Sequence, residues 1–540
     1  MAAKAPIPVY TQLNDLYNNL GTTVDHATRW NNLAEEFEKR FGRKPAYIAR
    51  APGRVNLIGE HIDYCLFGVL PAAVERDILI AIAPRAHDVP GHTVADNLLP
   101  KYTRAAFAPS HNHNEPSDSA VRAEPWHLEI NPAELRWESY VKAGYYGVLN
   151  QYFTPGSPVP VDLLVTGSVP AGSGLSSSAA MVVASTLAFL AVNGKLEPNL
   201  TNVGSKINKG ELVQLAVRNE TRVGVNSGGM DQAASVMCDA SSALYISFFP
   251  TLSATPVALP HGAVFVCANS LVVSDKAASA KFQYNLRVVE TLAAARALAL
   301  RLGVMVGPKE AITLREVLGR HVGEKEGEEI SVEKLEEALV KLSQEVEGLR
   351  PATSADGQLG VKLDEMIALT GLDTATFDEL YFSRFQVEAT YFQLYKRAKH
   401  VYDEALRVLQ FRKICIGGGS LEQLGDLMNA SQKSCAEVYE CSCPELDQLT
   451  TLAREAGAIG SRLTGAGWGG CTVSLVPEAQ VESFIAKVRD SYGPYKGLEG
   501  DKLSEVIFAT KPSSGACVYK FERRNVERSN QLCSRQGCMP

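Results

Sequence analysis

The chain has 540 residues, of which 46% are hydrophobic and 21% charged, and its formal net charge is −7 with a pI near 5.9. An acidic balance argues against nucleic acid or an anionic membrane surface as the main partner, because both attract basic proteins. The length predicts two to four domains. The 11 scattered cysteines do not suggest a small disulfide scaffold, and no secretory signal or transmembrane run is present, so we expect a cytoplasmic protein.

The first half of the chain alternates predicted helices and strands. Residues 11–41 are expected to be helical, with an apolar stripe that includes Trp30, Leu33 and Phe37. A short strand is expected at 46–49, followed by a turn at Pro52 and Gly53. The apolar runs at 78–83 and 161–167 predict buried strands, and the run at 179–193 predicts a buried helix.

The second half begins after a turn-rich gap near 255–262, which we take as a domain boundary. Apolar runs at 263–269 and 471–476 predict strands, and most of 281–405 reads as helical, with a charged amphipathic stretch at 328–349. The polar segment 108–125 predicts a surface loop, and the tail 521–540 predicts disorder. Together these elements indicate a mixed α and β architecture.

The first stretch that suggests chemistry is APGRVNLIGEHIDY at 51–64, which gathers Arg54, Glu60, His61 and Asp63 after the predicted strand. Carboxylates accept and imidazoles donate hydrogen bonds, as the hydroxyls of a sugar require. A charged surface turn with local salt bridges explains the same residues equally well. This stretch alone therefore leaves the choice open.

The second stretch, PAGSGLSSSAA at 170–180, precedes the apolar helix. Glycines let the backbone approach a ligand, exposed N–H groups at a helix N-terminus favour phosphate, and serine hydroxyls can face a phosphate-bound magnesium ion. From the residues alone, an ordinary serine N-cap is the simpler interpretation. No lysine follows the glycines as in a P-loop, and no dinucleotide-binding fingerprint follows a strand.

Two more glycine-rich stretches are LTGAGWGGC at 463–471 and GVNSGGMDQ at 224–232. Because glycine weakens strands, the first is best explained by a loop that passes close to a ligand or to another backbone, although a β-bulge remains open. In the second, Asp231 stands at the start of a helical stretch. An aspartate there is usually a cap, but it could also meet a substrate hydroxyl.

Together and in this order, these stretches resemble the GHMP kinase superfamily, and GRVNLIGEHIDY at 53–64 is similar to the galactokinase signature. The similarity continues through RAKHVYDEALRV at 397–408, YECSCPELDQL at 439–449 and GSRLTGAGWGGCTVSLVP at 460–477. The length of the chain and its sequence from Tyr284 to residue 290 look most like those of fungal galactokinases. The C-terminal sequence also looks like that of N-acetylgalactosamine kinases.

The resemblance implies an α+β fold with two domains and the active site between them. The implied domains are a mixed-sheet N-terminal domain at 1–258 and a ferredoxin-like C-terminal domain with helical additions at 259–540. The implied partners are galactose and ATP, with neither nucleic acid nor a membrane.

The resemblance also implies a role for each matching residue. Asp231 corresponds to a catalytic aspartate beside the anomeric hydroxyl, and Arg54 is its partner. The residues implied to hold the sugar are Glu60, His61, Asp63, Gly229 and Tyr284. The residues implied to bind the ATP phosphates are Gly172, Ser173, Gly174, Leu175, Ser176, Ser177 and Ser178, with Mg²⁺ at Ser177 or Ser178.

The implied reaction is ATP-dependent phosphorylation of galactose, in which Asp231 either accepts the hydroxyl proton or only orients that hydroxyl. One alternative is an N-acetylgalactosamine kinase, but Tyr284 stands where that relative carries Phe. The other is a galactose- and ATP-binding regulator that sequesters a transcriptional repressor. In such regulators the loop is shortened after the serines, whereas Ala179 and Ala180 are present here. A bifunctional protein stays open.

Overall fold

The structure is a computed structural model. It describes residues 2–16, 20–86, 88–111, 124–132, 134, 136–153, 156–196, 207–224, 228–273, 279–325, 327–351, 360–383 and 385–521. The expectations for most of the loop at 108–125 and for the tail at 521–540, apart from its first residue, fall outside these ranges. Within them, no helix combines the length and apolar character that crossing a bilayer requires.

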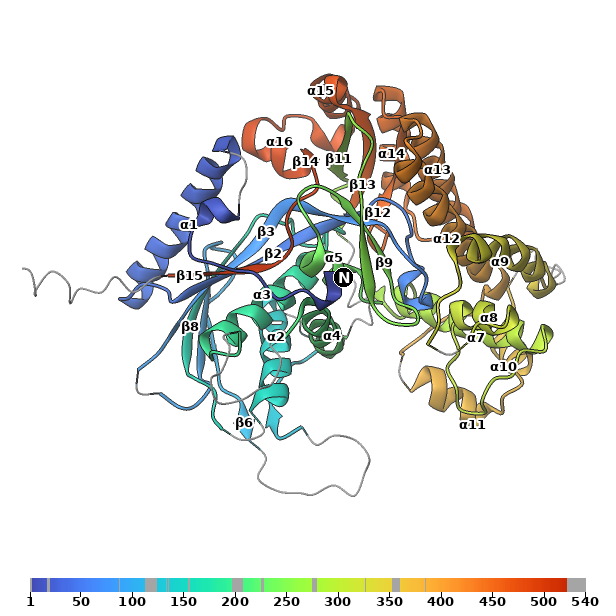
Figure 1. Ribbon diagram of the computed structural model, residues 1–540, viewed down its shortest axis with the longest axis horizontal. Helices are drawn as coiled ribbons and strands as arrows, with labels where there is room; N and C mark the ends of the chain where they lie inside the picture. Colours follow the sequence, from blue (N-terminus) through green and yellow to red (C-terminus); the bar gives the residue numbers. More distant parts are fainter. Residues whose placement is uncertain are drawn as a thin grey trace, which may run out of the picture.

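A seven-stranded mixed sheet has the strand order β1-β15-β2-β3-β8-β4-β5. Figure 1 shows it left of centre, where β2, β3, β8 and β15 are labelled. Its central strands pair antiparallel, whereas β4 pairs parallel with β8. The strands are β1 (Val9–Tyr10), β2 (Tyr47–Asn56), β3 (Pro71–Pro84), β4 (Thr93–Asn97), β5 (Ala105–Phe107), β8 (Val161–Gly167) and β15 (Cys517–Lys520). Two small hairpins accompany it: β6 (Ser110–His111) with β7 (Trp126–His127), and β9 (Ala243–Ser247) with β10 (Ser253–Val257).

Helices cover both faces of this sheet, which explains the continuous apolar runs of β3 and β8. Helix α1 (Leu20–Phe41) packs Trp30, Leu33 and Phe37 on one face, as the apolar stripe predicted, although the helix starts later than residue 11. Four helices lie on the other side, with α3 and α5 directly against β2 and β3. They are α2 (Trp137–Tyr152), α3 (Ser177–Val192), α4 (Lys209–Glu220) and α5 (Met230–Met237).

The second half contains a four-stranded antiparallel sheet with the order β12-β13-β11-β14. Its strands are β11 (Ala263–Asn269), β12 (Gly460–Thr464), β13 (Cys471–Pro477) and β14 (Ile507–Thr510). In chain order this is the 4-1-3-2 arrangement of a ferredoxin-like domain, as expected. Its covering helices are α13 (Leu421–Lys433), α14 (Pro444–Ala456), α15 (Val481–Ser491) and α16 (Gly500–Val506).

The helical additions form a separate cluster beside this sheet, at the lower right of Figure 1. They are α7 (Tyr284–Arg301), α8 (Leu314–His321), α9 (Val332–Glu345), α10 (Leu363–Thr370), α11 (Thr374–Phe377) and α12 (Leu394–Gly417). The amphipathic stretch behaves as predicted, because α9 buries Leu335, Leu339 and Leu342 while Glu333 and Glu337 are exposed. The long helix α12 packs against α7 and α9 and reaches the site through its buried polar residues.

Two features of the structure differ from the sequence-based expectations of two consecutive domains and of a turn at Pro52 and Gly53. The last strand, β15, returns to the first sheet and pairs with β1 and β2. The expected turn at Pro52 and Gly53 is wrong, because both residues lie inside β2, where the register with β3 shifts between Pro52 and Arg54. A Cβ on Gly53 would lie 2.7 Å from the Leu175 carbonyl oxygen, so this irregular point lets another loop approach the strand closely.

Candidate functional site

Arg54 and Asp231 meet at the centre of the site although 177 positions separate them in the sequence. Arg54 lies on β2 just past the irregular point, and Asp231 lies in the first turn of α5, which Gly229 begins with a φ of 104°. The Arg54 Nε is 2.8 Å from Asp231 Oδ1, and its Nη1 donates to the Gly174 carbonyl oxygen at 2.7 Å. One buried guanidinium therefore links the carboxylate to the serine-glycine loop.

The loop at 170–178 and the loop at 465–470 pack backbone against backbone. A Cβ on Gly174 would lie 2.8 Å from the Thr464 carbonyl oxygen, and one on Gly470 would lie 2.8 Å from that of Ser173. Both glycines also have positive φ angles, of 74° and 80° respectively. Glycine is therefore needed at both positions, which explains the glycine clusters noted in the sequence.

A cavity of about 1410 Å³ opens beside these two loops. The start of α3, with Ser176, Ser177 and Ser178, lines it on one side, and Ala466, Gly467 and Gly469 line it on the other. The aromatic residues Tyr102, Trp137 and Tyr140 also line it. Backbone N–H groups at a helix start favour phosphate, and aromatic side chains suit a nucleotide base.

Two residues of this cavity have oxygen atoms that suit a magnesium ion. The Ser176 hydroxyl is buried and has no hydrogen-bond partner among the described residues. Glu220, at the end of α4, lines the same cavity and accepts a hydrogen bond from Gln232 Nε2 at 2.6 Å. The described residues contain no group of three or more Asp, Glu, His or Cys side chains placed so that they could hold a metal ion by themselves. That is compatible with Mg²⁺, which is usually held by one or two carboxylates together with substrate phosphates.

Glu220 could not be predicted from the sequence, because an acidic residue at a helix end is most often an ordinary surface residue. Only the fold brings α4 beside the start of α3. The predicted magnesium contacts, Ser177 and Ser178, do line the cavity and are partly exposed there.

Asp63 and Tyr284 lie near the carboxylate of Asp231. The Met230 N–H donates to Asp63 Oδ2 at 3.3 Å. Burial, together with the nearby charge of Asp231, raises the pKa of Asp63 to about 6. Burial raises the pKa of Tyr284 well above its usual value, and Asp63 and Asp231 add to this shift, so its hydroxyl stays protonated and able to donate.

His61 is almost fully enclosed and adopts a positive φ of 61°. Its Nε2 lies 2.8 Å from the Ala466 carbonyl oxygen, and its Nδ1 lies 3.0 Å from the Tyr64 hydroxyl. Its ring also neighbours Tyr284, at a centroid distance of 5.6 Å. The histidine therefore joins the first stretch to the third glycine-rich loop.

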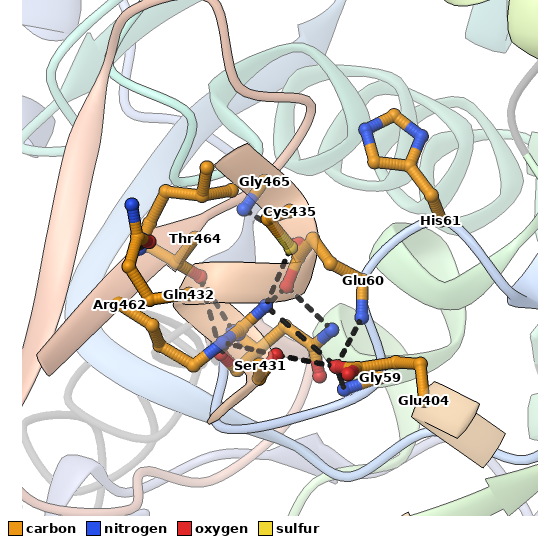
Figure 2. A network of polar contacts seen from close by, with 12 residues as sticks. Gly59, Glu60, His61, Glu404, Ser431, Gln432, Cys435, Arg462, Thr464 and Gly465 are labelled. Atoms are coloured by element: carbon orange, nitrogen blue, oxygen red, sulfur yellow. Dashed lines mark hydrogen bonds and ion pairs between the residues drawn. The ribbon is translucent and has the colours of Figure 1, made fainter. Parts of the chain in front are cut away.

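Glu60 is buried in a polar network that Figure 2 shows from close by. Its Oε2 accepts from Arg462 Nη1 at 2.8 Å and from Asn56 Nδ2 at 2.8 Å, and its Oε1 accepts from the Gly465 N–H at 2.7 Å. Burial raises its pKa, although Arg462 and Arg54 oppose that change. Glu60 thus holds β12 and the third loop against the first stretch.

Helix α12 supports the same stretch with two buried residues that the sequence alone did not assign. Glu404 Oε1 accepts from the Gly59 N–H at 2.9 Å and from the Ser431 hydroxyl at 2.6 Å (Figure 2). Burial would raise its pKa, but the charges of Arg407 and Arg462 outweigh this and lower the pKa to about 2. His400 Nε2 lies 3.0 Å from the Glu60 carbonyl oxygen, and burial lowers the pKa of His400 to about 4.

The chain matches three family profiles that define a kinase of the GHMP class. They are the galactokinase galactose-binding signature at residues 35–84, the GHMP kinases N terminal domain at 139–239, and the GHMP kinases C terminal domain at 408–493. A galactokinase from Lactococcus lactis, solved in complex with galactose, superimposes with a TM-score of 0.59 at 24% identity. It covers 90% of this chain and 99% of its own, which shows the same fold.

Curated relatives extend the match over almost the whole chain. Galactokinases from Dictyostelium discoideum and Saccharomyces cerevisiae are both 35% identical to it, over 94% and 92% of this chain and 97% and 95% of their own. The galactokinase from Schizosaccharomyces pombe is 32% identical over 96% of this chain and 99% of its own. The chain therefore belongs to the galactokinase family. These relatives give no support to the two alternative functions, and membership of a kinase family implies that ATP is used.

Proposed function

We propose that this chain transfers the γ-phosphoryl group of ATP to the anomeric hydroxyl of galactose and releases galactose 1-phosphate and ADP. The observation that carries the proposal is the Arg54 side chain, which reaches both Asp231 and the Gly174 carbonyl. Phosphoryl transfer requires in-line positioning and stabilisation of charge on the transferred group. An arginine that is always charged, held between a carboxylate and the phosphate-binding loop, supplies both.

Asp231 would contact the anomeric hydroxyl, either to accept its proton or to orient it for attack. Asp63, His61 and Tyr284 would form the wall around the sugar, with Gly229 at the start of α5. Glu60 would shape this wall, because both of its carboxylate oxygens bind protein partners.

The nucleotide would occupy the cavity, with its phosphates on the loop of residues 172–178. Ser177 or Ser178 would hold Mg²⁺, with the Ser176 hydroxyl and Glu220 as further oxygen ligands within the same cavity. When bound, this ion would neutralise negative charge on the phosphates. The protein's own contribution is to seat and orient the two substrates.

Two further predictions belong to this proposal. The domain boundary at 258 and 259 falls between β10 and β11, so the first domain would contain the seven-stranded sheet except for β15, and the second domain would contain the four-stranded sheet. A cytoplasmic location is supported by nine cysteines of the described ranges that carry free thiols. The relatives are named as galactokinases, so repressor binding is not included in the proposal.

The test is ATP turnover on a panel of hexoses by the purified chain, with the 2-acetamido analogue of galactose included. We expect turnover on galactose with Mg²⁺ present and loss of turnover when Mg²⁺ is chelated. Faster turnover on the 2-acetamido sugar would replace the proposal with the N-acetylgalactosamine kinase. Nucleotide binding without turnover on any hexose would reject catalysis.

A further inference from the structure

The hydrogen bonds of His61 define which of its ring nitrogens carries the proton. Its Nε2 lies 2.8 Å from the Ala466 carbonyl oxygen, and a carbonyl oxygen can only accept, so Nε2 is the protonated nitrogen. In the neutral ring, Nδ1 is then an acceptor, and the Tyr64 hydroxyl at 3.0 Å donates to it.

The Tyr64 hydroxyl has a second partner, the hydroxyl of Tyr439 at 2.5 Å. Because Tyr64 gives its proton to His61, Tyr439 is the donor in this bond. Tyr439 is fully buried, and its ring is close to those of both His61 and His400, at centroid distances of 4.9 and 4.3 Å. A chain of hydrogen bonds therefore runs from Tyr439 through Tyr64 to His61.

The backbone that carries Tyr439 is held in place independently. Its carbonyl oxygen accepts from Arg287 Nε at 2.9 Å and from Arg397 Nη1 at 3.0 Å. Two residues further on, the Cys441 carbonyl accepts from the Trp468 N–H at 2.8 Å. Residues 439–441 therefore support the loop at 465–470, which lines the cavity on its other side.

We propose that Tyr439 is a positioning residue for the sugar. The Ala466 carbonyl sets the Nε2–H form of His61, and the Tyr439 hydroxyl, acting through Tyr64, holds the Nδ1 side of the ring so that it stays beside Tyr284, without contact between Tyr439 and the substrate. This inference rests on the proposed function, since it assumes that His61 helps to form the galactose subsite.

The test compares Tyr439→Phe, Tyr64→Phe and the double variant. Each single variant removes one hydroxyl and keeps the ring. For Tyr439→Phe we expect the KM for galactose to rise about fivefold, while kcat and the KM for ATP change by less than about twofold. Because Tyr439 acts through Tyr64, the double variant should be no worse than Tyr64→Phe alone. Additive effects of the two substitutions would overturn the inference.

Tyr402→Phe is the matched control. Tyr402 on α12 is also fully buried, and its hydroxyl donates one hydrogen bond, to the Leu314 carbonyl at 3.1 Å, away from the site. We expect this variant to lower the melting temperature with unchanged KM values. If Tyr439→Phe behaves in the same way, its role is only structural and the inference fails. A wild-type chain inert towards galactose would instead reject the proposed function, and this inference with it.

Discussion

At the scale of single residues, a substitution at Asp231, the partner of Arg54, can show whether this carboxylate acts in the phosphoryl transfer step or only in galactose binding. Asp231→Asn keeps the shape of the side chain but removes its basicity. If Asp231 accepts the hydroxyl proton, kcat should fall by ~100-fold or more while galactose still binds. Steady-state kinetics and calorimetric titration with galactose would measure the two effects. Asp239→Asn, at an exposed turn after α5, is the control. Near-normal turnover by Asp231→Asn would show that the carboxylate only orients the hydroxyl.

The raised pKa of Asp63 predicts a pH dependence in the acidic range. Burial and the charge of Asp231 bring this pKa from 3.8 to about 6, so the carboxyl becomes protonated as the pH falls through 6. The ionised form, which would accept hydrogen bonds from sugar hydroxyls in the proposed subsite, is then lost. We expect kcat/KM for galactose to fall by up to tenfold per pH unit below about 6. Profiles of the wild type and of Asp63→Asn would test this, and an unchanged limb in the variant would assign it to another group.

The same shift has the opposite consequence for stability. Between about pH 4 and 6 the folded chain holds a proton on Asp63 that the unfolded chain releases. The contribution of Asp63 to the free energy of unfolding therefore decreases as the pH rises through this range. Asp63 thus favours function above pH 6 at some cost to the fold, as is common for buried acids at functional sites.

At the scale of elements, the irregular point of β2 determines how closely the loop at 170–178, the proposed phosphate-binding loop, approaches the strand. Gly53→Ala would place a Cβ 2.7 Å from the Leu175 carbonyl oxygen and push the loop away from Arg54. We expect the KM for ATP to rise roughly fivefold or more, because such overpacking typically costs ~1–3 kcal/mol. Gly417→Ala, where nothing lies within 4 Å of the added Cβ, is the control. An unchanged KM in Gly53→Ala would show that the loop adapts without loss of function.

The elements that the sequence predicted well are those whose pattern is local. The strands at 161–167 and 263–269 match β8 and β11, because burial on both faces leaves an unbroken apolar run. Pro52 and Gly53 predict a turn from their residue types alone, and only the partner strand and the nearby Leu175 carbonyl show that they form an irregular point inside β2. The short strand β15 contains no unbroken apolar run, so the sequence does not predict it. It forms because it pairs with β1 and β2.

The candidate site shows the same division between local and long-range information. Resemblance to the family selected Arg54 and Asp231, and the fold brings them together. The supporting residues Glu404 and Arg462 are charged, and charged residues in a helix and a strand normally predict solvent exposure. Glu404 has one partner close in sequence, Arg407, but its contact with Gly59 and the contact of Arg462 with Glu60 join groups that are distant in sequence, so no local pattern could have revealed their burial.

At the scale of the whole molecule, the return of β15 ties the end of the chain to its beginning. Arg50 on β2 forms an ion pair with Asp77 at 2.6 Å and also donates to the Ser514 carbonyl at 2.9 Å, just before β15. Val518, at the centre of the strand, is fully buried. The N-terminal sheet is therefore completed only after the C-terminal domain has been synthesised.

A chain that stops at residue 511 should consequently fail to complete the first sheet, although every implied catalytic residue is present. Without β15, β1 loses its partner and β2 presents an unpaired apolar edge, which promotes aggregation. We expect most of the folded, soluble yield to be lost, as measured by size-exclusion chromatography and thermal melting. A chain that stops at 521 retains β15 and separates this effect from removal of the remaining tail. If the chain ending at 511 is folded and active, β15 is dispensable, and the N-terminal sheet forms without help from the end of the chain.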